Sequence, residues 1–157
     1  MKFQIEREVL LGPLSIVASV IERRQTLPIL ANVFLRLEGK RLTLVGTDLE
    51  VEISIETDVL SGEDGECTVT ARKLLDICRA LPETASIDFS GEGDKTKMRS
   101  GKSRFTLQAL PAKDFPRLEA GTWEERTTIA RTELKALLDR TSFSMAQQDV
   151  RYFLNGV

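Results

Sequence analysis

The chain has 157 residues, of which 41% are hydrophobic and 29% charged, with a formal net charge of −2. This balance is typical of a folded globular protein, and so small a charge does not by itself indicate a nucleic-acid binder. The absence of histidine removes the most common general base and metal ligand, which lowers the expectation of catalysis.

Two further classes are disfavoured by short sequence features. Cys67 and Cys78 form no CxxC motif, so we expect two reduced, packed thiols and neither a disulfide framework nor a zinc site. The most apolar run, residues 9–21, is interrupted by Gly12 and Pro13 and is too short to span a membrane. Charged residues follow the N-terminus at once, which excludes a secretory signal and predicts a cytoplasmic protein.

The first 60 residues predict the order strand, helix, strand, strand, strand. Apolar residues recur at helical spacing after a short first strand, although Pro13 indicates a kink or a later helix start. Gly39-Lys40 indicates a two-residue turn between two alternating segments. We expect strands at residues 2–6, 32–38, 41–47 and 48–57, and a helix at residues 7–23.

The same order recurs after a loop at residues 61–66. Strands are expected at residues 67–70, 86–90, 95–99 and 102–108, a helix at residues 71–81, and a turn at Ser100-Gly101. A duplicated unit of about 60 residues predicts an α+β domain with a sheet layer on one side and two helices on the other.

A new unit is expected to begin after a proline-containing linker at residues 110–119. A strand at residues 125–130, a helix at 131–142 and a strand at 151–157 would repeat the start of the pattern. The sequence therefore predicts a first domain at residues 1–120, with repeats at 1–60 and 66–109, and a truncated second domain at residues 121–157.

Charge is expected to differ between the layers. The outer face of the helix at residues 71–81 holds Arg72, Lys73 and Arg79 against Asp76, a net charge of +2. The first helix exposes small residues, which would allow a bulky partner to approach closely. The strand predicted at residues 48–57 carries alternating carboxylates, so the helix layer would attract DNA and the sheet layer would repel it. Two ordinary solvated faces would give the same pattern.

The carboxylates of that strand also allow a different function. Asp48, Glu50 and Glu52 could bind Mg²⁺ in a metal-dependent nuclease, because hard oxygen ligands suit that ion. Three ligands on one strand, with no evident base, make this the weaker alternative. A sequence-specific DNA reader is also disfavoured, since the first helix lacks base-reading side chains.

Six motifs in order resemble the bacterial DNA sliding clamp, the beta subunit of DNA polymerase III. They are MKFxxERExLLxPL at residues 1–14, RxTLPILxN at 24–32, LTLxGTDLExE at 42–52, ARKxxDICRxLP at 71–82, RSGxSRFxLxxLPAxDFP at 99–116 and FSMAxQDVRYxLNG at 143–156. The resemblance implies the DNA-clamp fold, in which each domain is a duplicated β-α-β-β-β unit with helices on one face of the sheets.

The resemblance also implies a function. Family members are non-catalytic processivity factors without a cofactor. Two subunits of three domains each form a head-to-tail ring that encircles duplex DNA and tethers the replicative polymerase. Their contacts with DNA are electrostatic and independent of sequence. Their partners are DNA, a second clamp subunit, the polymerase and the clamp loader.

The resemblance also assigns site roles to the residues of this chain that match the family's functional positions. The resemblance assigns DNA binding to Arg24, Arg72, Lys73, Arg79, Gln148, Tyr152 and Phe153, where Phe153 replaces a frequent second tyrosine. It assigns the subunit interface to Lys95, Lys102, Arg104, Phe105 and Leu107, expected on edge strands. Leu154 matches one wall of the pocket that receives partner peptides, and the rest of that pocket would lie beyond Val157.

Overall fold

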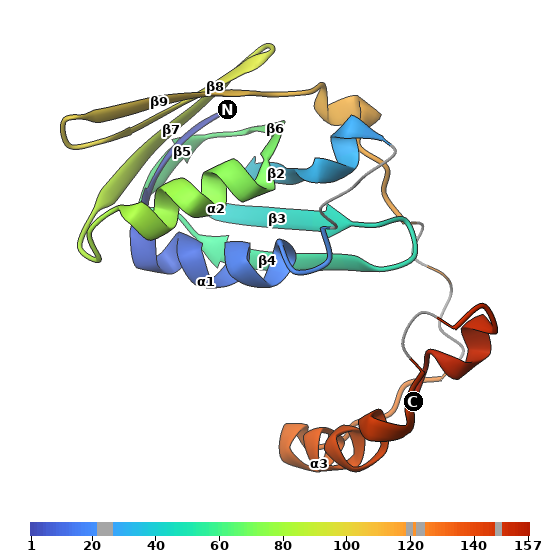
Figure 1. Cartoon of the computed structure of the whole chain (residues 1–157). Coiled ribbons are helices and arrows are strands. Elements are labelled where there is room, and N and C mark those ends of the chain that lie inside the picture. Colours follow the sequence, from blue (N-terminus) through green and yellow to red (C-terminus); the bar gives the residue numbers. More distant parts are fainter. Residues whose placement is uncertain (22–26, 119–120, 122–124, 147–148) are drawn as a thin grey trace. The chain divides into compact units, whose positions relative to one another are not determined.

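In a computed structural model the chain forms two compact units, residues 1–119 and 120–157 (Figure 1). The structure describes residues 1–21, 27–118, 121, 125–146 and 149–157, without the side chain of Tyr152.

The first unit contains two antiparallel sheets and two helices. In chain order its elements are β1 (Lys2–Glu6), α1 (Arg7–Val17), η1 (Pro28–Ala31), β2 (Asn32–Glu38), β3 (Arg41–Thr47), β4 (Glu52–Asp58), β5 (Ser61–Glu63), β6 (Gly65–Thr70), α2 (Ala71–Ala80), β7 (Ser86–Glu92), β8 (Lys95–Ser100), β9 (Ser103–Gln108) and η2 (Ala112–Asp114). The expected duplicated order is confirmed, with β5 as an additional short strand in the segment expected to be a loop.

The two repeats exchange their first strands. One sheet has the order β5-β1-β7-β8-β9 and the other β4-β3-β2-β6. Strand β1 of the first repeat therefore pairs with β7 of the second, and β6 of the second repeat pairs with β2 of the first. The single sheet layer expected from the sequence is thus two sheets, each built from both repeats.

Helix α1 starts where the periodicity predicted and continues through Pro13, so a later start is wrong. It ends at Val17 and not near residue 23. The Ser19 amide bonds to the carbonyl of Ile16 at 3.1 Å, and the Ser19 hydroxyl reaches the same oxygen at 2.7 Å. These tighter local bonds replace the α-helical pattern and close the last turn.

The strand expected at residues 48–57 is interrupted. Asp48 Oδ1 accepts hydrogen bonds from the amides of Glu50 and Val51 at 2.9 and 2.7 Å, and Leu49 has a φ of 82°. This turn delays the start of β4 to Glu52. Perfect alternation of polar and apolar residues did not reveal a turn that an aspartate side chain stabilises.

Two hairpins test the turn predictions. The Gly39-Lys40 turn is confirmed, because Glu38 pairs with Arg41 and Gly39 has a φ of 60°. In the second hairpin Ser100 pairs with Ser103, so the turn is Gly101-Lys102, one residue later than expected.

One core lies between the helices and the two sheets. Leu10, Leu14 and Val17 of α1 are fully buried, as are Leu74 and Cys78 of α2. The rings of Phe3 and Phe89, on the neighbouring strands β1 and β7, stack with centroids 4.6 Å apart. Burial of these side chains removes apolar surface from water on one face of each element.

A second, smaller cluster covers the opposite face of the four-stranded sheet. Phe34 and Val45 pack with Phe115 of the segment that follows β9, and the rings of Phe34 and Phe115 lie 5.5 Å apart. Both faces of β2 are therefore covered, which explains why its burial does not alternate. The expected linker thus packs against the sheet through Ala112 and Phe115.

The second unit contains α3 (Arg131–Thr141), η3 (Ser142–Ser144) and η4 (Tyr152–Leu154). The expected helix is confirmed, but the strands expected at residues 125–130 and 151–157 are wrong. Among its described residues there is no second strand to pair with, and an unpaired strand leaves its backbone groups unbonded. No described helix in either unit is long and apolar enough to cross a membrane.

Candidate DNA-binding face and subunit edge

The exposed face of α2 gathers most of the predicted DNA-binding residues that the structure describes. Ala71, Leu74, Leu75 and Cys78 face the core, which leaves Arg72, Lys73 and Arg79 exposed together with Asp76. Among the described residues, none of these three cations has an ion-pair partner. They therefore carry charge that the fold itself does not neutralise.

The position of two of these cations opposes helix stability. Thr70 is the N-cap, and Arg72 and Lys73 lie in the first turn, which contains no acidic residue. Cations at a helix N-terminus interact unfavourably with the macrodipole, whereas Arg79 in the last turn interacts favourably. Helix stability therefore explains Arg79 but not Arg72 or Lys73. Their charge adds to the positive helix end and favours a bound anion.

A residue that the sequence did not single out fixes the other end of this helix. Arg7 Nε donates to the carbonyl oxygen of Cys78 at 3.0 Å, and its side chain is only 14% exposed. Burial raises the pKa of the Cys78 thiol to about 12, against the opposing effect of the Arg7 guanidinium. Arg7 thus ties the start of α1 to the last turn of α2. Its place between two glutamates gave no signal of this role.

The remaining predicted DNA contacts belong to other segments of the chain. Arg24 and Gln148 lie outside the described residues. Tyr152 and Phe153 belong to η4 of the second unit, where the side chain of Phe153 is 69% exposed. Leu154, expected in the partner-peptide pocket, is 36% exposed, and its carbonyl accepts a hydrogen bond from the amide of Ala146 at 2.9 Å.

A polar network shapes the segment that carries these residues. The Asp149 amide donates to Asn155 Oδ1 at 3.0 Å, and Asn155 Nδ2 donates to the Asp149 carbonyl at 3.1 Å. Arg151 donates to both carboxylate oxygens of Asp149 at 3.1 and 3.0 Å. The Arg151 side chain and amide hold the pKa of Asp149 below its usual value. This pairing defines a compact turn in place of the expected strand.

The residues expected at the subunit interface have different surroundings. Strand β9 is at the edge of its sheet, as expected, and exposes Arg104. Lys95 lies on β8, which is an inner strand, and Lys102 lies in the turn before β9. Leu107 is 7% exposed and belongs to the core, because alternate side chains of β9 face inward. Phe105 is half-buried against the same core.

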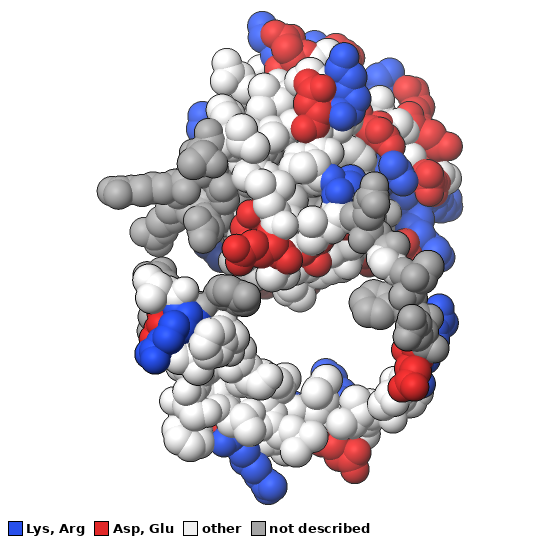
Figure 2. All heavy atoms as spheres, turned by 90° about the vertical axis from the view of Figure 1, so that its right-hand side faces the viewer, with Lys and Arg blue, Asp and Glu red and all other residues white. Residues whose placement is uncertain are grey.

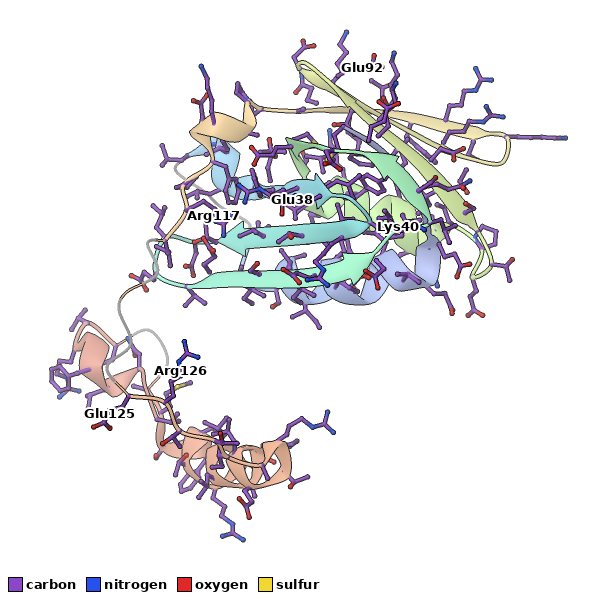
Figure 3. All side chains as sticks on the ribbon, turned by 180° about the vertical axis from the view of Figure 1, so that it is seen from behind. Glu38, Lys40, Glu92, Arg117, Glu125 and Arg126 are labelled. Atoms are coloured by element: carbon purple, nitrogen blue, oxygen red, sulfur yellow. The ribbon has the colours of Figure 1, made fainter. Side chains whose placement is uncertain are left out.

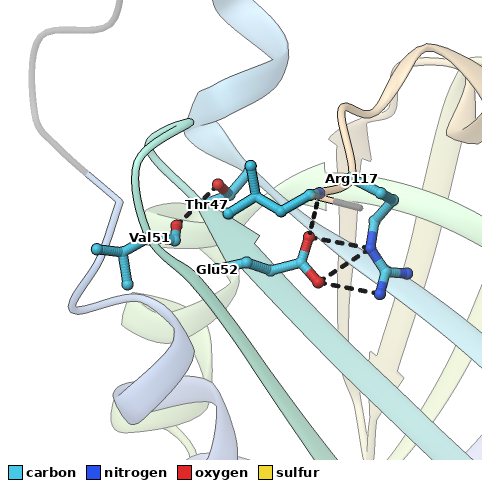
Figure 4. Close-up of polar contacts among 5 residues, drawn as sticks. Thr47, Val51, Glu52 and Arg117 are labelled. Carbon is cyan, nitrogen blue, oxygen red and sulfur yellow. Dashed lines mark hydrogen bonds and ion pairs between the residues drawn. The ribbon is translucent and has the colours of Figure 1, made fainter. Parts of the chain in front are cut away.

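Two of the three carboxylates proposed for a metal site have structural roles. Asp48 caps the turn before β4, and Glu50 lies within that turn. The Glu52 carboxylate accepts hydrogen bonds from Arg117 at 3.0 to 3.2 Å and from the Leu118 amide at 3.0 Å (Figure 4). No group of three potential metal ligands occurs among the described residues. The nuclease alternative therefore loses its only structural basis.

The outer face of the four-stranded sheet carries more acidic than basic side chains, as expected. Its acidic residues are Glu38, Glu52, Glu56, Asp58 and Glu66, and its basic residues are Arg36 and Arg41. Glu66 pairs with Arg36 at 2.7 Å, and Glu56 pairs with Arg41 at 3.4 Å. Arg117 also lies 5.7 Å from the centroid of the Phe34 ring, beside the end of the sheet (Figure 3). Figure 2 shows acidic and basic side chains interspersed on the face of the first unit that it presents.

A sequence profile described as DNA polymerase III beta subunit, N-terminal domain, matches residues 1–119. The chain belongs to this family. It is similar to the beta sliding clamp of Pseudomonas aeruginosa, with 55% identity over all of this chain and 43% of that protein. The nuclease alternative gains no support from this family.

Solved structures of the family have the same fold. The crystal structure of DNA polymerase III subunit beta from Pseudomonas aeruginosa matches 99% of this chain and 43% of its own, with 54% identity and a TM-score of 0.94. A beta subunit from Caulobacter crescentus matches 99% of this chain and 42% of its own at 40% identity, with a TM-score of 0.94. The chain thus spans less than half the length of these family members, and the α+β clamp fold is confirmed.

Proposed function

We propose that this chain forms part of a DNA sliding clamp, a non-catalytic processivity factor that encircles duplex DNA and tethers the replicative polymerase in the cytoplasm. The observation that carries this proposal is the exposed face of α2. Arg72 and Lys73 form no ion pair among the described residues and occupy the helix end where cations cost stability. Membership of the beta subunit family supports the same conclusion.

The chemistry of this face suits sliding. Lysine and arginine side chains on an open helix surface attract phosphates through charge and counterion release, without reading bases. Such contacts are interchangeable along the duplex, so the protein can move without breaking a specific complex. In this proposal Arg24, Gln148, Tyr152 and Phe153 add contacts from segments outside α2.

The ring would close through the edge strand β9. Its unpaired backbone groups can extend the sheet into a second clamp subunit, with Arg104 and the exposed part of Phe105 beside the junction. Lys102 in the preceding turn and Lys95 on β8 would contribute charge near the same edge. Leu107 would support the strand from the core side. Leu154 would contribute to the site for polymerase and clamp-loader peptides.

Domain organisation forms part of the proposal. We assign residues 1–120 to the first clamp domain and residues 121–157 to the start of a second. The two compact units, divided after residue 119, are compatible with this assignment.

A topological assay tests the proposal. These 157 residues would replace the aligned part of the Pseudomonas aeruginosa beta sliding clamp, and the chimera would be loaded onto nicked circular DNA. We expect retention on circles and prompt loss after the circle is cut once, because a ring slides off an end. Equal retention on circular and linear DNA would indicate a surface-binding protein and would refute the ring.

A further inference from the structure

The outward face of the five-stranded sheet carries a groove that the proposed DNA-binding face does not use. A hollow of about 800 Å³ lies on this face. It is lined by three neighbouring rows of residues, and in each row one residue from each of the five strands lies opposite the next. The middle row runs from Gly62 to Phe105, and since its apolar side chains face the core, its backbone forms the floor. The flanking rows end at Arg104 and Thr106 on β9, and their exposed polar side chains form the walls.

The dimensions of this groove suit an extended peptide. Five strands at a spacing of about 4.8 Å give a length of about 19 Å, and the two walls are about 7 Å apart because they lie two residues apart along each strand. About six residues of an extended chain cover that length. The groove is far narrower than a DNA duplex.

Positive charge concentrates at the β8–β9 end of the groove. Arg99 lies directly opposite Arg104 across these strands, and Lys97 lies on the other wall, where it pairs with Glu92 at 3.2 Å. Like charges directly opposite one another destabilise a sheet. Neither arginine forms an ion pair among the described residues, although Asp88 faces Arg99 from β7, and Arg99 Nε makes only a long contact of 3.5 Å to the carbonyl of Gly101. The fold therefore holds two guanidinium groups side by side without an ion pair.

Carboxylates lie along the rest of the groove. Glu63 on β5 pairs with Lys2 at 3.3 Å. Asp88 on the middle strand β7 lies directly opposite Arg99 and accepts a hydrogen bond from Gln4 Nε2 at 3.2 Å. A nucleic-acid strand has one negative charge at every nucleotide, so its phosphates would meet these carboxylates. A peptide can instead place carboxylates at the β8–β9 end only. The charge distribution along the groove thus favours a peptide over a nucleic acid.

We propose that this groove binds an extended acidic segment of another protein. Its carboxylates would pair with Arg99 and Arg104, while neutral residues would cross β1 and β7. The inference does not depend on the proposed ring, because every lining residue belongs to the first unit. Arg104 is also expected at the subunit edge, so the test relies on Arg99 and not on Arg104.

The test uses the ¹⁵N-labelled chain and a synthetic peptide, Asp-Glu-Asp-Gly-Ser-Gly-Ser-Gly, with the amide peptide Asn-Gln-Asn-Gly-Ser-Gly-Ser-Gly as control. We expect chemical-shift changes on the lining segments of β1, β7, β8 and β9 with the acidic peptide alone. Arg99→Ser should weaken binding by about tenfold or more, since it removes a charge-assisted contact. Lys40→Ser is the control, because it removes one positive charge at the β2–β3 turn. Figure 3 shows Lys40 away from Glu92 and the β7–β8 turn, so this change should leave peptide binding unchanged.

Three results would overturn the proposal. These are equal binding of the amide peptide, an equal loss of affinity in Lys40→Ser, and tighter binding of single-stranded oligothymidylate in the groove than of the acidic peptide. Arg99→Ser should melt near the temperature of the parent chain, because the like-charge neighbour Arg104 and the opposite-charge neighbour Asp88 are lost together, so misfolding would be recognised. The same change in the chimera should leave topological retention on DNA intact, which separates failure of this inference from failure of the ring.

Discussion

Lys73→Glu should stabilise the first unit while weakening its interaction with DNA. Thr70 is the N-cap of α2, where its side chain makes no capping hydrogen bond, and Lys73 is the third helical residue. This substitution therefore creates the Thr-x-x-Glu sequence of a capping box. It also replaces an unfavourable charge at the positive helix end by a favourable one, and each of these effects contributes about 0.3–1 kcal/mol. We therefore expect the free energy of unfolding to rise by about 1 kcal/mol.

The expected effect on DNA binding has the opposite sign. At 0.1 M monovalent salt, one phosphate contact contributes about eightfold to affinity through counterion release. Lys73→Gln removes this contact and keeps a side chain suited to the capping box, so it should cost about eightfold and reduce the logarithmic salt slope by about 1. Lys73→Glu should cost more because it adds repulsion.

Two measurements on the 157-residue chain check both effects. Urea unfolding followed by circular dichroism gives the stability, and fluorescence anisotropy with a labelled duplex over a range of salt gives the affinity and its slope. Lys113→Glu, at an exposed position on η2, controls for the change in net charge. A destabilised Lys73→Glu variant with unchanged DNA affinity would refute the reasoning, because the cations of α2 would then serve the fold.

Three further predictions concern stability and can be measured by urea unfolding. Gly46→Ala should lower the free energy of unfolding by about 1–3 kcal/mol, because the added Cβ would lie 2.8 Å from Cγ1 and the carbonyl oxygen of Val17. Gly12→Ala, with open space around it in α1, should raise the free energy of unfolding by about 0.5–1 kcal/mol. Equal effects of the two changes would contradict the packing of α1 on β3. Arg117→Ala should lower the free energy of unfolding by about 1 kcal/mol, because it releases the linker from Glu52. Arg41→Ala, in an ion pair whose two side chains are both exposed, should change it by less than about 0.5 kcal/mol. An unchanged stability of Arg117→Ala would show that the Glu52–Arg117 contact does not stabilise the fold. Burial raises the pKa of both cysteines from 9.0 to about 12. Stability should therefore fall as the pH rises from about 9 toward 12, where the unfolded thiols ionise and the folded ones do not, and replacement of both by alanine should remove this fall.

Local sequence predicted much of the secondary structure because most elements carry their own signal. The spacing of Leu74 and Cys78 places one face of α2 in the core, and that same spacing exposes Arg72 and Lys73. Gly39 allows the positive φ of its hairpin turn without help from distant residues. The predictions failed where a side-chain contact or the lack of a neighbouring strand determined the local structure. Asp48 is an example, because its carboxylate caps a turn inside an alternating pattern.

The sequence by itself therefore determined the duplicated unit, the amphipathic helices and the unpaired cations of α2, because each depends on residues close together in the chain. Only the tertiary structure decided which strands share a sheet. The exchange of β1 and β6 between the repeats, the Glu52–Arg117 contact and the groove that ends at Arg99 and Arg104 all join residues far apart in the chain. Periodicity specifies which face of a strand is buried but not which neighbour it pairs with, since backbone hydrogen bonds are the same for every partner.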